Sequence, residues 1–487
     1  MSTKNIVLIT TDQQRYDSLG CCGGSWMRTP SLDALAASGA RFSRAYCTNP
    51  VCTPSRVSIM TGKLPGRHGS YNIGTRVRTT EDFLSARLTA AGWRTHHIGK
   101  AHFYPWDVPS EENRASYPEE PLRDFAGFET AELTVGHTDW GVTGHYEHWL
   151  RRHGVVKGRH MPELQVKRLL PGDAYGTADW GLPAHLHSGW WIVERAEAFL
   201  RSLEPGRPFF LNLGFQDPHH PLAVPSDFPK LPMDAIPPAR GGYDPRLLHL
   251  DALANGTIET SRSGGRFGIA GNQNTRWLDY PEEHKRLVRQ YYYTMIELYD
   301  RQIGALLEAF RRCGQLENTL FLVTTDHGDL LFDHGIGEKG PASYEGVLHV
   351  PLIAAAPGLI APQTVDEPVS LADLLPTVLD YAGLPPAGCD GLSLRPLLEG
   401  GAWSREAVCA EFMEEPDAVR YRCAATKRWK LTVYDGEAFG ELYDLAADPE
   451  EERNLFFDPA YASVIRELQA QLPPKPRLPL AERPCRC

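Results

Sequence analysis

Cys52 begins a segment in which a thiol, a fixed cation and the start of a helix occur close together. The segment reads Cys52-Thr-Pro-Ser-Arg56. Pro54 is typical of a first helical position and Gly62 of a helix end, so the sequence predicts a short helix here. A helix N-terminus offers free backbone N–H groups to an anion, and Arg56 adds a positive charge one turn later. The pattern favours a nucleophile beside a site for a tetrahedral oxyanion; the alternative is a buried structural cysteine.

Two apolar segments of the same design end in Thr-Thr and lead directly into Asp12-Gln13 and Asp326-His327. Such continuous apolar runs are typical of buried strands. Two carboxylates, an amide oxygen and an imidazole are able to hold one divalent cation, with positions left for the residue at Cys52 and for a substrate oxygen. A single aspartate at a strand end could merely cap the next helix or turn. Two matched ends in one sheet favour a metal site.

Polar side chains follow four predicted strands, which span residues 5–11, 94–98, 208–214 and 319–325. Lys100 and His102 follow the second of these strands, and His219 follows the third. In open α/β sheets, ligands bind beyond the carboxyl ends of the strands. The sequence therefore predicts a single site formed by the four strand ends.

Helical patterns alternate with these strands, at residues 31–38, 80–88 and about 281–313. The alternation predicts an α/β fold with a large, mainly parallel central sheet flanked by helices. Turn-forming sequence follows near residues 385–401, then hairpin strands at 420–426 and 429–434 and a helix at about 460–471. We therefore expect a catalytic domain over residues 1–385, with an insertion at about 104–191. A smaller C-terminal α+β domain with an antiparallel sheet is expected over residues 386–487.

The composition limits the classes of partner. The chain has 487 residues, 42% of them apolar and 23% charged, and a formal net charge of −11. The negative charge argues against nucleic acid or an anionic membrane surface as a partner. No apolar stretch has the length of a transmembrane helix and the N-terminal sequence lacks signal-peptide features, so we expect a cytoplasmic protein. The ten cysteines show no disulfide framework, and the terminal pair Cys485 and Cys487 is assigned no role.

Further motifs accompany the Cys52 segment, which continues to Lys63; they are Gly99-Lys100-x-His102, Pro218-His219-x-Pro221, Asp326-His327-Gly328, Lys339-Gly340 and the segments 373–383 and 441–455. Together they resemble the formylglycine sulfatases of the alkaline phosphatase superfamily, over almost the whole chain. The resemblance implies a large α/β domain, a smaller C-terminal sheet domain and hydrolysis of sulfate esters at a single divalent cation. Calcium is the usual ion of that family.

The resemblance implies that Cys52 is oxidised to formylglycine, which makes a formylglycine-generating enzyme the expected maturation partner. The hydrated aldehyde has two hydroxyl groups. One attacks sulfur and displaces the alcohol, and the second allows the covalent sulfate to leave by collapse back to the aldehyde. Arg56 is expected to fix this diol and to offset its charge.

Four more residues acquire roles from the resemblance. Lys100 and Lys339 are expected to bind sulfate oxygens as charge develops in the transition state. His102 is expected to act as the base on the second hydroxyl, and His219 as the acid or hydrogen-bond donor at the leaving oxygen. The alternatives are solvated surface lysines and histidines that only satisfy backbone groups. Near the same motifs we expect structural or peripheral roles for His220, His334, Asp329 and Asp333.

Two departures from the common pattern of that family bear on the metal and the substrate. Many members have two consecutive aspartates in place of Asp12-Gln13 and an asparagine in place of His327. One carboxylate fewer and an imidazole make the site softer, so Mn²⁺ is an alternative to Ca²⁺. Asp-Gln also occurs in related phosphonate monoester hydrolases, which makes phosphonate monoester and phosphodiester hydrolysis the alternative activity. The Lys100-x-His102 pair favours the sulfatase, and an unconverted Cys52 would leave a non-catalytic anion-binding protein.

The natural substrate stays open at this stage. Aryl, alkyl and carbohydrate sulfates all fit, and we expect a small-molecule ester. The insertion at 104–191 is rich in tryptophan and histidine, including His137. Such a segment could form a pocket wall or a contact between copies in a homo-oligomer.

Overall fold

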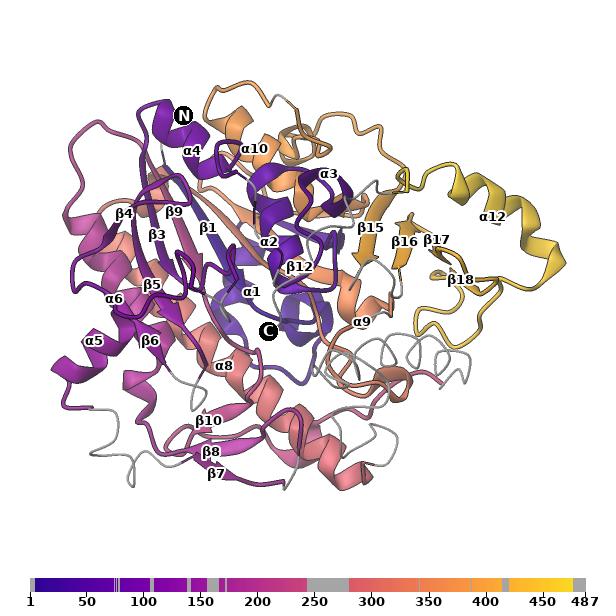
Figure 1. Ribbon diagram of the computed structural model, residues 1–487, viewed down its shortest axis with the longest axis horizontal. Helices are drawn as coiled ribbons and strands as arrows, with labels where there is room; N and C mark the ends of the chain where they lie inside the picture. The colour runs from indigo at the N-terminus through magenta and orange to yellow at the C-terminus, as the bar shows by residue number, and fades with distance from the viewer. Residues whose placement is uncertain are drawn as a thin grey trace.

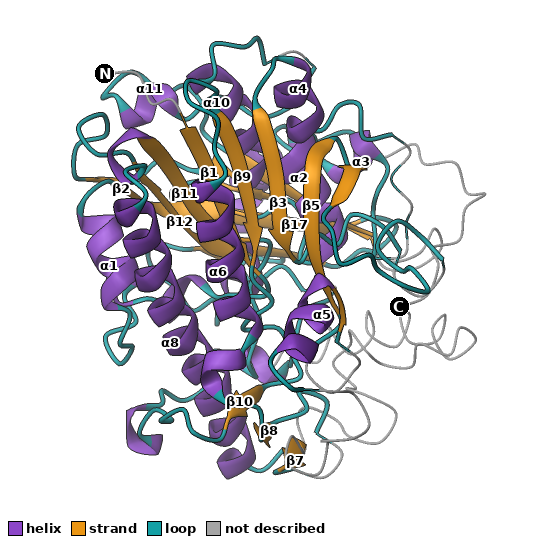
Figure 2. Cartoon of the chain, turned by 90° about the vertical axis from the view of Figure 1, so that its left-hand side faces the viewer, coloured by secondary structure: helices purple, strands orange, loops and turns teal. Residues whose placement is uncertain are grey.

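The computed structural model describes residues 5–73, 75, 77, 79–105, 109–137, 142–155, 166–170, 173–242, 280–340, 342–386, 388–413 and 420–475. A large central sheet runs through this part of the chain, with strand order β13-β2-β12-β11-β1-β9-β3-β5-β4. Figure 2 shows helices α1, α6 and α8 in front of this sheet. The strands of the sheet span β1 Asn5–Thr11, β2 Ala40–Tyr46, β3 Arg94–Gly99, β4 Leu122–Phe125, β5 Phe128–Val135, β9 Phe209–Gly214, β11 Thr319–Thr325, β12 His349–Ala355 and β13 Gln363–Val365, with short β6 Thr143–Gly144 and β14 Val369–Ser370 beside them.

The helices are, in chain order, α1 Pro30–Ala37, α2 Cys52–Thr61, α3 Pro65–His68, α4 Leu84–Ala90, α5 His145–Arg152, α6 Ser188–Arg201, α8 Glu282–Arg312, α9 Glu345–Leu348, α10 Leu374–Tyr381, α11 Arg395–Leu398 and α12 Ala462–Gln469. The long helix predicted at 281–313 is therefore confirmed within one residue at each end. The helix predicted from residue 80 begins only at Leu84, because Phe83 before it has extended backbone angles. Asp82 in the preceding turn pairs with Lys63 instead of starting the helix.

The central sheet is mixed, and its parallel part carries the predicted strands. β11, β1, β9, β3 and β5 lie side by side and run parallel, while β12 pairs antiparallel with both β11 and β2. β4 closes the other edge antiparallel to β5. Antiparallel strands at the edges of an otherwise parallel sheet are common in large α/β folds. The prediction of a mainly parallel sheet thus describes the centre, and the flanks depart from it.

Part of the predicted insertion at 104–191 belongs to this sheet, because it contributes β4 and β5. A separate three-stranded sheet contains β7 Val166–Arg168, β8 Ala178–Trp180 and β10 Ala223–Pro225. Trp149, Trp180 and Trp191 are buried in the hydrophobic core under this region. These three tryptophans are therefore core residues and do not form an exposed wall.

Alternating side chains on the central strands divide the core into two layers. Ile6 and Leu8 of β1 belong to one buried cluster, and Val7 and Ile9 to the other. This is the two-residue period of a strand covered on both faces. The first cluster includes residues of α2, α4 and α10, and the second includes residues of α1, α6 and α8.

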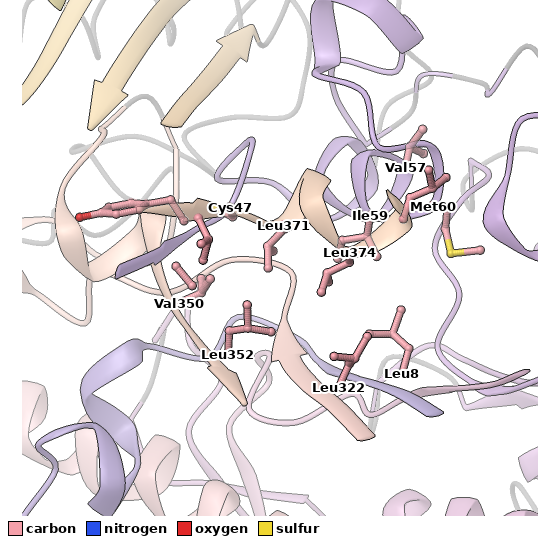
Figure 3. Close-up of a cluster of buried hydrophobic side chains, with 14 of the residues drawn as sticks. Leu8, Cys47, Val57, Ile59, Met60, Leu322, Val350, Leu352, Leu371 and Leu374 are labelled. Atoms are coloured by element: carbon pink, nitrogen blue, oxygen red, sulfur yellow. The ribbon is translucent and has the colours of Figure 1, made fainter. Parts of the chain in front are cut away.

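Helix α2 is fixed to the sheet by the first of these clusters. Figure 3 shows Val57, Ile59 and Met60 of α2 in one cluster with Leu8 of β1 and Leu322 of β11. Each of the three α2 side chains is almost fully buried, which stabilises the fold by about 1.5–3 kcal/mol per side chain. The helix ends at Gly62, whose φ of 64° is the left-handed conformation expected at a helix end.

A second sheet follows in the C-terminal part of the chain (Figure 1). It is antiparallel, in the order β15 Val408–Met413, β16 Arg420–Ala425, β17 Trp429–Tyr434 and β18 Gly440–Asp444. Leu431 and Leu442 on one face pack against Leu468 of α12. No helix within the described residues is both long enough and apolar enough to cross a membrane.

Candidate active site

The carboxyl ends of β1 and β11 bring Asp12 and Asp326 together. The two strands pair in parallel with Thr11 opposite Thr325, so the residues that follow them are neighbours. The backbone N–H of Gln13 donates to Asp326 Oδ1 at 3.0 Å across the pair. Both carboxylates are fully buried. The matched Thr-Thr-Asp segments therefore meet at one point, as the sequence predicted.

Cys52 is the first residue of α2 and is fully buried beside this pair. Its Sγ lies 3.2 Å from His327 Nε2, 3.3 Å from Lys339 Nζ and 3.6 Å from Asp12 Oδ1. Burial raises the pKa of the thiol to about 11, so Cys52 is protonated at neutral pH. Pro54 is the third helical residue rather than the first. A proline is tolerated there because the N–H groups of the first turn have no partner inside the helix.

Arg56, one turn along α2, links the helix to both carboxylates. Its Nε donates to Asp326 Oδ2 at 2.8 Å, and its Nη2 lies 3.3 Å from Asp12 Oδ2. Lys100, from the loop after β3, contacts the same oxygen of Asp12. Burial alone would raise the pKa of Asp12, but Lys100, Arg56 and Lys339 together hold it well below its usual value. Both carboxylates are thus placed by cations from other segments of the chain.

Four of these residues fit a divalent cation. Asp12, Cys52, Asp326 and His327 are all buried, and each offers a ligand atom within 4.8 Å of the others. His327 Nδ1 lies 2.8 Å from the carbonyl oxygen of Gly328 and donates a hydrogen bond to it, so Nε2 carries the lone pair and faces Cys52 and Lys339. Burial lowers the pKa of His327 to about 4, so the ring is neutral, as a metal ligand must be.

Gln13 faces the same cluster through its amide oxygen. Its Oε1 accepts a hydrogen bond from Lys339 Nζ at 2.7 Å, the same ammonium that lies 3.3 Å from Cys52 Sγ. Its Nε2 donates to Asp329, whose other carboxylate oxygen accepts from the Tyr175 hydroxyl at 2.7 Å. The backbone of Gln13 has a φ of 67°. Asp329, expected to be structural or peripheral, therefore has a structural role and orients the amide of Gln13.

Lys100, His102 and His219 lie on the more open side of the cluster, together with His137. His137 Nε2 lies 3.2 Å from Lys100 Nζ, and its ring stacks on His219 with 4.5 Å between centroids. Burial, followed by the charge of Lys100, lowers the pKa of His102 and of His137 well below the usual value. Burial and His220 do the same for the pKa of His219. The three imidazoles are therefore neutral near pH 7.

His137 also lies beside these residues, and the sequence motifs did not identify it. It follows β5, which runs parallel to β3 as the next strand in the sheet. Gln216, after β9, fixes the end of β5 by donating to the carbonyl of Gly136. The apolar positions of 128–135 carried the signal for this strand, but the segment was assigned to the insertion. The pairing of β5 with β3 is what makes a fifth strand end part of the site.

Asp333 and His334 lie outside the site, as expected. Asp333 pairs with Arg15 at 2.7 Å, and His334 stacks on Tyr344 with 3.6 Å between ring centroids. His220 stacks on His219 and approaches Gln13 through Nδ1 at 3.4 Å. Of the four residues expected to be structural or peripheral, His220 and Asp329 thus support site residues, and Asp333 and His334 support the fold.

The electrostatic balance of the cluster favours an anion. Three cationic side chains, Arg56, Lys100 and Lys339, surround the two carboxylates of Asp12 and Asp326. Burial works against the charge on Lys339, but the carboxylates of Asp12 and Asp326 raise its pKa, so its ammonium is retained. The N-terminus of α2 adds its own free N–H groups. The site can therefore hold a divalent cation and an oxyanion together.

Comparisons with known proteins agree with this geometry. A family model for sulfatases matches residues 4–384, and one for the C-terminal part of N-sulphoglucosamine sulphohydrolase matches residues 333–476. The chain is 31% identical over 476 residues to an arylsulfatase of Clostridium perfringens (strain 13 / Type A). The aligned region covers 96% of this chain and 92% of the relative. Choline-sulfatase of Rhizobium meliloti (strain 1021) is 28% identical over 462 residues, and this alignment covers 93% of this chain and 83% of the relative.

A solved structure, the phosphonate monoester hydrolase of Agrobacterium radiobacter, superposes with a TM-score of 0.77 at 25% identity and covers 96% of each chain. The sulfatase model alone spans most of the chain, and it includes every residue of the Cys52 cluster. The chain therefore belongs to the sulfatase family of sulfuric ester hydrolases, within the alkaline phosphatase superfamily.

Proposed function

We propose that this sulfatase hydrolyses sulfate monoesters at residue 52, after oxidation of Cys52 to formylglycine, beside one divalent cation. In the overall reaction the ester and water give an alcohol and hydrogen sulfate. The observation that carries the proposal is the position of Cys52 Sγ, which lies within 3.6 Å of Asp12, His327 and Lys339 at once. A nucleophile at this position lies beside the proposed cation ligands and beside an ammonium that could bind sulfate oxygens.

The cation would be held by Asp12, Gln13, Asp326, His327 and the residue at position 52. When bound, it supplies Lewis-acid stabilisation of the negative charge that develops during attack. Calcium is the first choice because four of these five ligands, including formylglycine, would be oxygen donors. Manganese is the alternative because His327 contributes a nitrogen.

Formylglycine, as its hydrate, supplies one hydroxyl for attack at sulfur and a second that allows sulfate to leave. Arg56 would orient this diol from its position one turn along α2. Because Cys52 is fully buried in the folded chain, a formylglycine-generating enzyme would have to act before α2 packs onto the sheet. The modification is thus proposed to precede folding.

Lys100 and Lys339 would bind the sulfate oxygens, and the imidazoles would move protons. Lys339 is fully buried and Lys100 nearly so, which strengthens their attraction for the charge that develops on the sulfate group. His219 would protonate the leaving alcohol, and His102 would accept a proton from the second hydroxyl of the diol. The carbonyl oxygen of His220 accepts from Nδ1 of His219, so the single N–H of the neutral ring is already engaged and His219 would first take up a proton at Nε2 before it protonates the alcohol.

The alternative activity is hydrolysis of phosphonate monoesters or phosphodiesters by the same nucleophile. The similarity to a phosphonate monoester hydrolase supports it, as does Gln13 in place of a second aspartate. The Lys100–His102 pair favours the sulfatase activity, because it adds a cation against Asp12 on the substrate side of the cluster. The arylsulfatase and choline-sulfatase relatives support a small aryl or alkyl sulfate as the substrate class.

Paired rates on 4-nitrophenyl sulfate and a phenylphosphonate monoester test the proposal, with protein whose formylglycine content is quantified by mass spectrometry. Faster sulfate hydrolysis in proportion to formylglycine content is expected. Faster hydrolysis of the phosphonate would instead support the alternative activity, phosphonate monoester hydrolysis. Cys52→Ala, which cannot be converted, is the control and should abolish both rates.

A further inference from the structure

Glu112 holds the turn that presents Lys100 and His102 to the site. Its Oε2 accepts from the backbone N–H of His102 at 2.8 Å. Its Oε1 accepts from Phe103 at 2.6 Å and from Tyr104 at 3.1 Å. Three successive N–H groups therefore converge on one carboxylate, in the manner of a backbone nest around an anion.

The turn needs such a support because its backbone is unusual. β3 ends at Gly99, whose φ is 106° and where a Cβ would lie 2.1 Å from the carbonyl oxygen of Gly214. His102 itself has a φ of 57°, a conformation that non-glycine residues adopt rarely. The buried Nδ1 of His102 has no hydrogen-bond partner within the described residues. The direction of the imidazole is therefore set by the backbone rather than by a side-chain partner.

The two ends of this loop are held by different segments. Before the turn, the N–H of Lys100 donates to Gly214 at 2.8 Å, and its carbonyl accepts from Arg56 at 3.4 Å. After Lys100, the backbone is held by the hydrogen bonds from residues 102–104 to Glu112. Glu112 is itself fixed, since its N–H donates to Ser110 Oγ at 3.2 Å and its carbonyl accepts from the Tyr117 hydroxyl.

We propose that Glu112 is a positioning residue for sulfate ester hydrolysis, whose carboxylate fixes the turn at His102–Tyr104 and through it the approach of His102 and Lys100 to residue 52. The inference rests on the proposed function of this site. Within the described part of the chain, the carboxylate of Glu112 accepts from the three N–H groups of the turn and from none of the cluster residues, so it would act through the turn.

The ionisation of Glu112 links this geometry to pH. Burial raises its pKa to about 7, against the opposing effect of the three N–H groups and of Arg56. Within the described residues, the titratable or charged groups that contact it or act on it are Arg56 from α2, His102 and Tyr104 from the turn, and Tyr117 from its own segment. A proton on one oxygen turns an acceptor into a donor that faces an N–H. The turn is then fully supported only above about pH 7.

Steady-state kinetics on 4-nitrophenyl sulfate between about pH 5 and 9 test this inference, with formylglycine content quantified. Wild-type kcat is expected to rise with a midpoint near pH 7. In Glu112→Gln this rise should disappear, and kcat at alkaline pH should fall by about 10- to 100-fold, the usual effect of misplacing a catalytic group. Glu112→Asp should keep the rise with a lower kcat.

Glu411→Gln is the matched control. Burial also raises the pKa of Glu411 to about 7, but its carboxylate accepts from Gly66, outside the His102 turn. This variant should keep the wild-type pH profile. Loss of the rise in Glu411→Gln, or a Glu112→Gln enzyme that is less stable but unchanged in kcat and pH profile, would overturn the proposal.

Nuclear magnetic resonance of ¹³C-labelled histidine separates this inference from the proposed activity. The His102 signal, assigned by its absence in His102→Asn, should shift with a midpoint near pH 7 in wild-type protein and stay constant in Glu112→Gln. A His102 signal whose chemical shift does not change with pH in this range would contradict the role of Glu112, whether or not the protein turns over any ester. Absence of turnover by converted protein would instead count against the proposed function.

Discussion

Lys339 places its ammonium 3.3 Å from the sulfur of Cys52, although 287 residues separate the two in the chain. The contact forms because Lys339 follows β11 and Cys52 begins the helix that packs beside β11 and β1. The same ammonium donates to Gln13 Oε1 at 2.7 Å. One buried cation therefore touches the proposed nucleophile and a proposed metal ligand.

Lys339→Met is expected to lower kcat/KM for a sulfate ester by about 10²- to 10³-fold, because a buried charge aimed at the developing oxyanion is lost. Most of the loss should be in kcat. Formylglycine content must be matched between variant and wild type. Lys427→Met, which removes an exposed lysine paired with Glu367, is the control and should leave both constants unchanged. Equal effects of the two substitutions would contradict the role of Lys339.

His327→Asn replaces a nitrogen ligand by an oxygen and is expected to move the metal preference from Mn²⁺ toward Ca²⁺. The change in the ratio of the two affinities should be about tenfold or more. Titration calorimetry of the metal-free protein with each ion measures it. His334→Asn, in the same loop but stacked on Tyr344, should leave the ratio unchanged. An unaltered ratio in His327→Asn would remove His327 from the ligand set.

Lys430→Met should destabilise the contact between β17 of the C-terminal sheet and α9. Lys430 is almost fully buried, lies 3.0 Å from Glu345 and contacts Glu451. Without its charge the buried Glu451 and the partly buried Glu345 lose the cation that they share, and breaking such a buried pair costs about 3–5 kcal/mol in the free energy of unfolding. Urea unfolding at neutral pH measures this. Lys427→Met again serves as the control and should change the free energy by no more than about 0.5 kcal/mol.

His97 should make the fold sensitive to mild acid. Burial lowers its pKa from 6.5 to about 3, so between these values the unfolded chain binds a proton that the folded chain does not. Stability is therefore lost as the pH falls below 6.5, and one such group contributes a loss of about 2 kcal/mol between pH 7 and pH 5.

His97→Gln should reduce this acid-dependent loss when urea unfolding is compared at the two pH values. The substitution also disturbs the contact with Asn212, so the difference between pH values is the diagnostic quantity rather than stability at one pH. His185→Gln, at an exposed position, should leave the difference unchanged. An identical acid-dependent loss in His97→Gln and wild type would show that His97 is not responsible.

The local chemistry of the site could be predicted from the sequence because short segments encode it. The apolar runs before Asp12 and Asp326 define two buried strands, and the ends of parallel strands meet at one edge of a sheet. The segment from Cys52 to Gly62 likewise contains its own helix start and stop. The α/β class, the Cys52 cluster and the sulfatase resemblance all depend on such local patterns.

Only the tertiary structure decided which other segments join the cluster. His137 enters it because β5 pairs with β3, and strand pairing depends on burial across the whole sheet rather than on residues 128–135 alone. Asp329 and Glu112 act through hydrogen bonds to Gln13 and to the His102 turn, and neither bond leaves a periodic trace in the sequence. The mixed edges of the sheet also escaped prediction, because strand direction is set by how connections pack. The sequence thus determined the reactive groups, and the packing of distant segments determined how they are held.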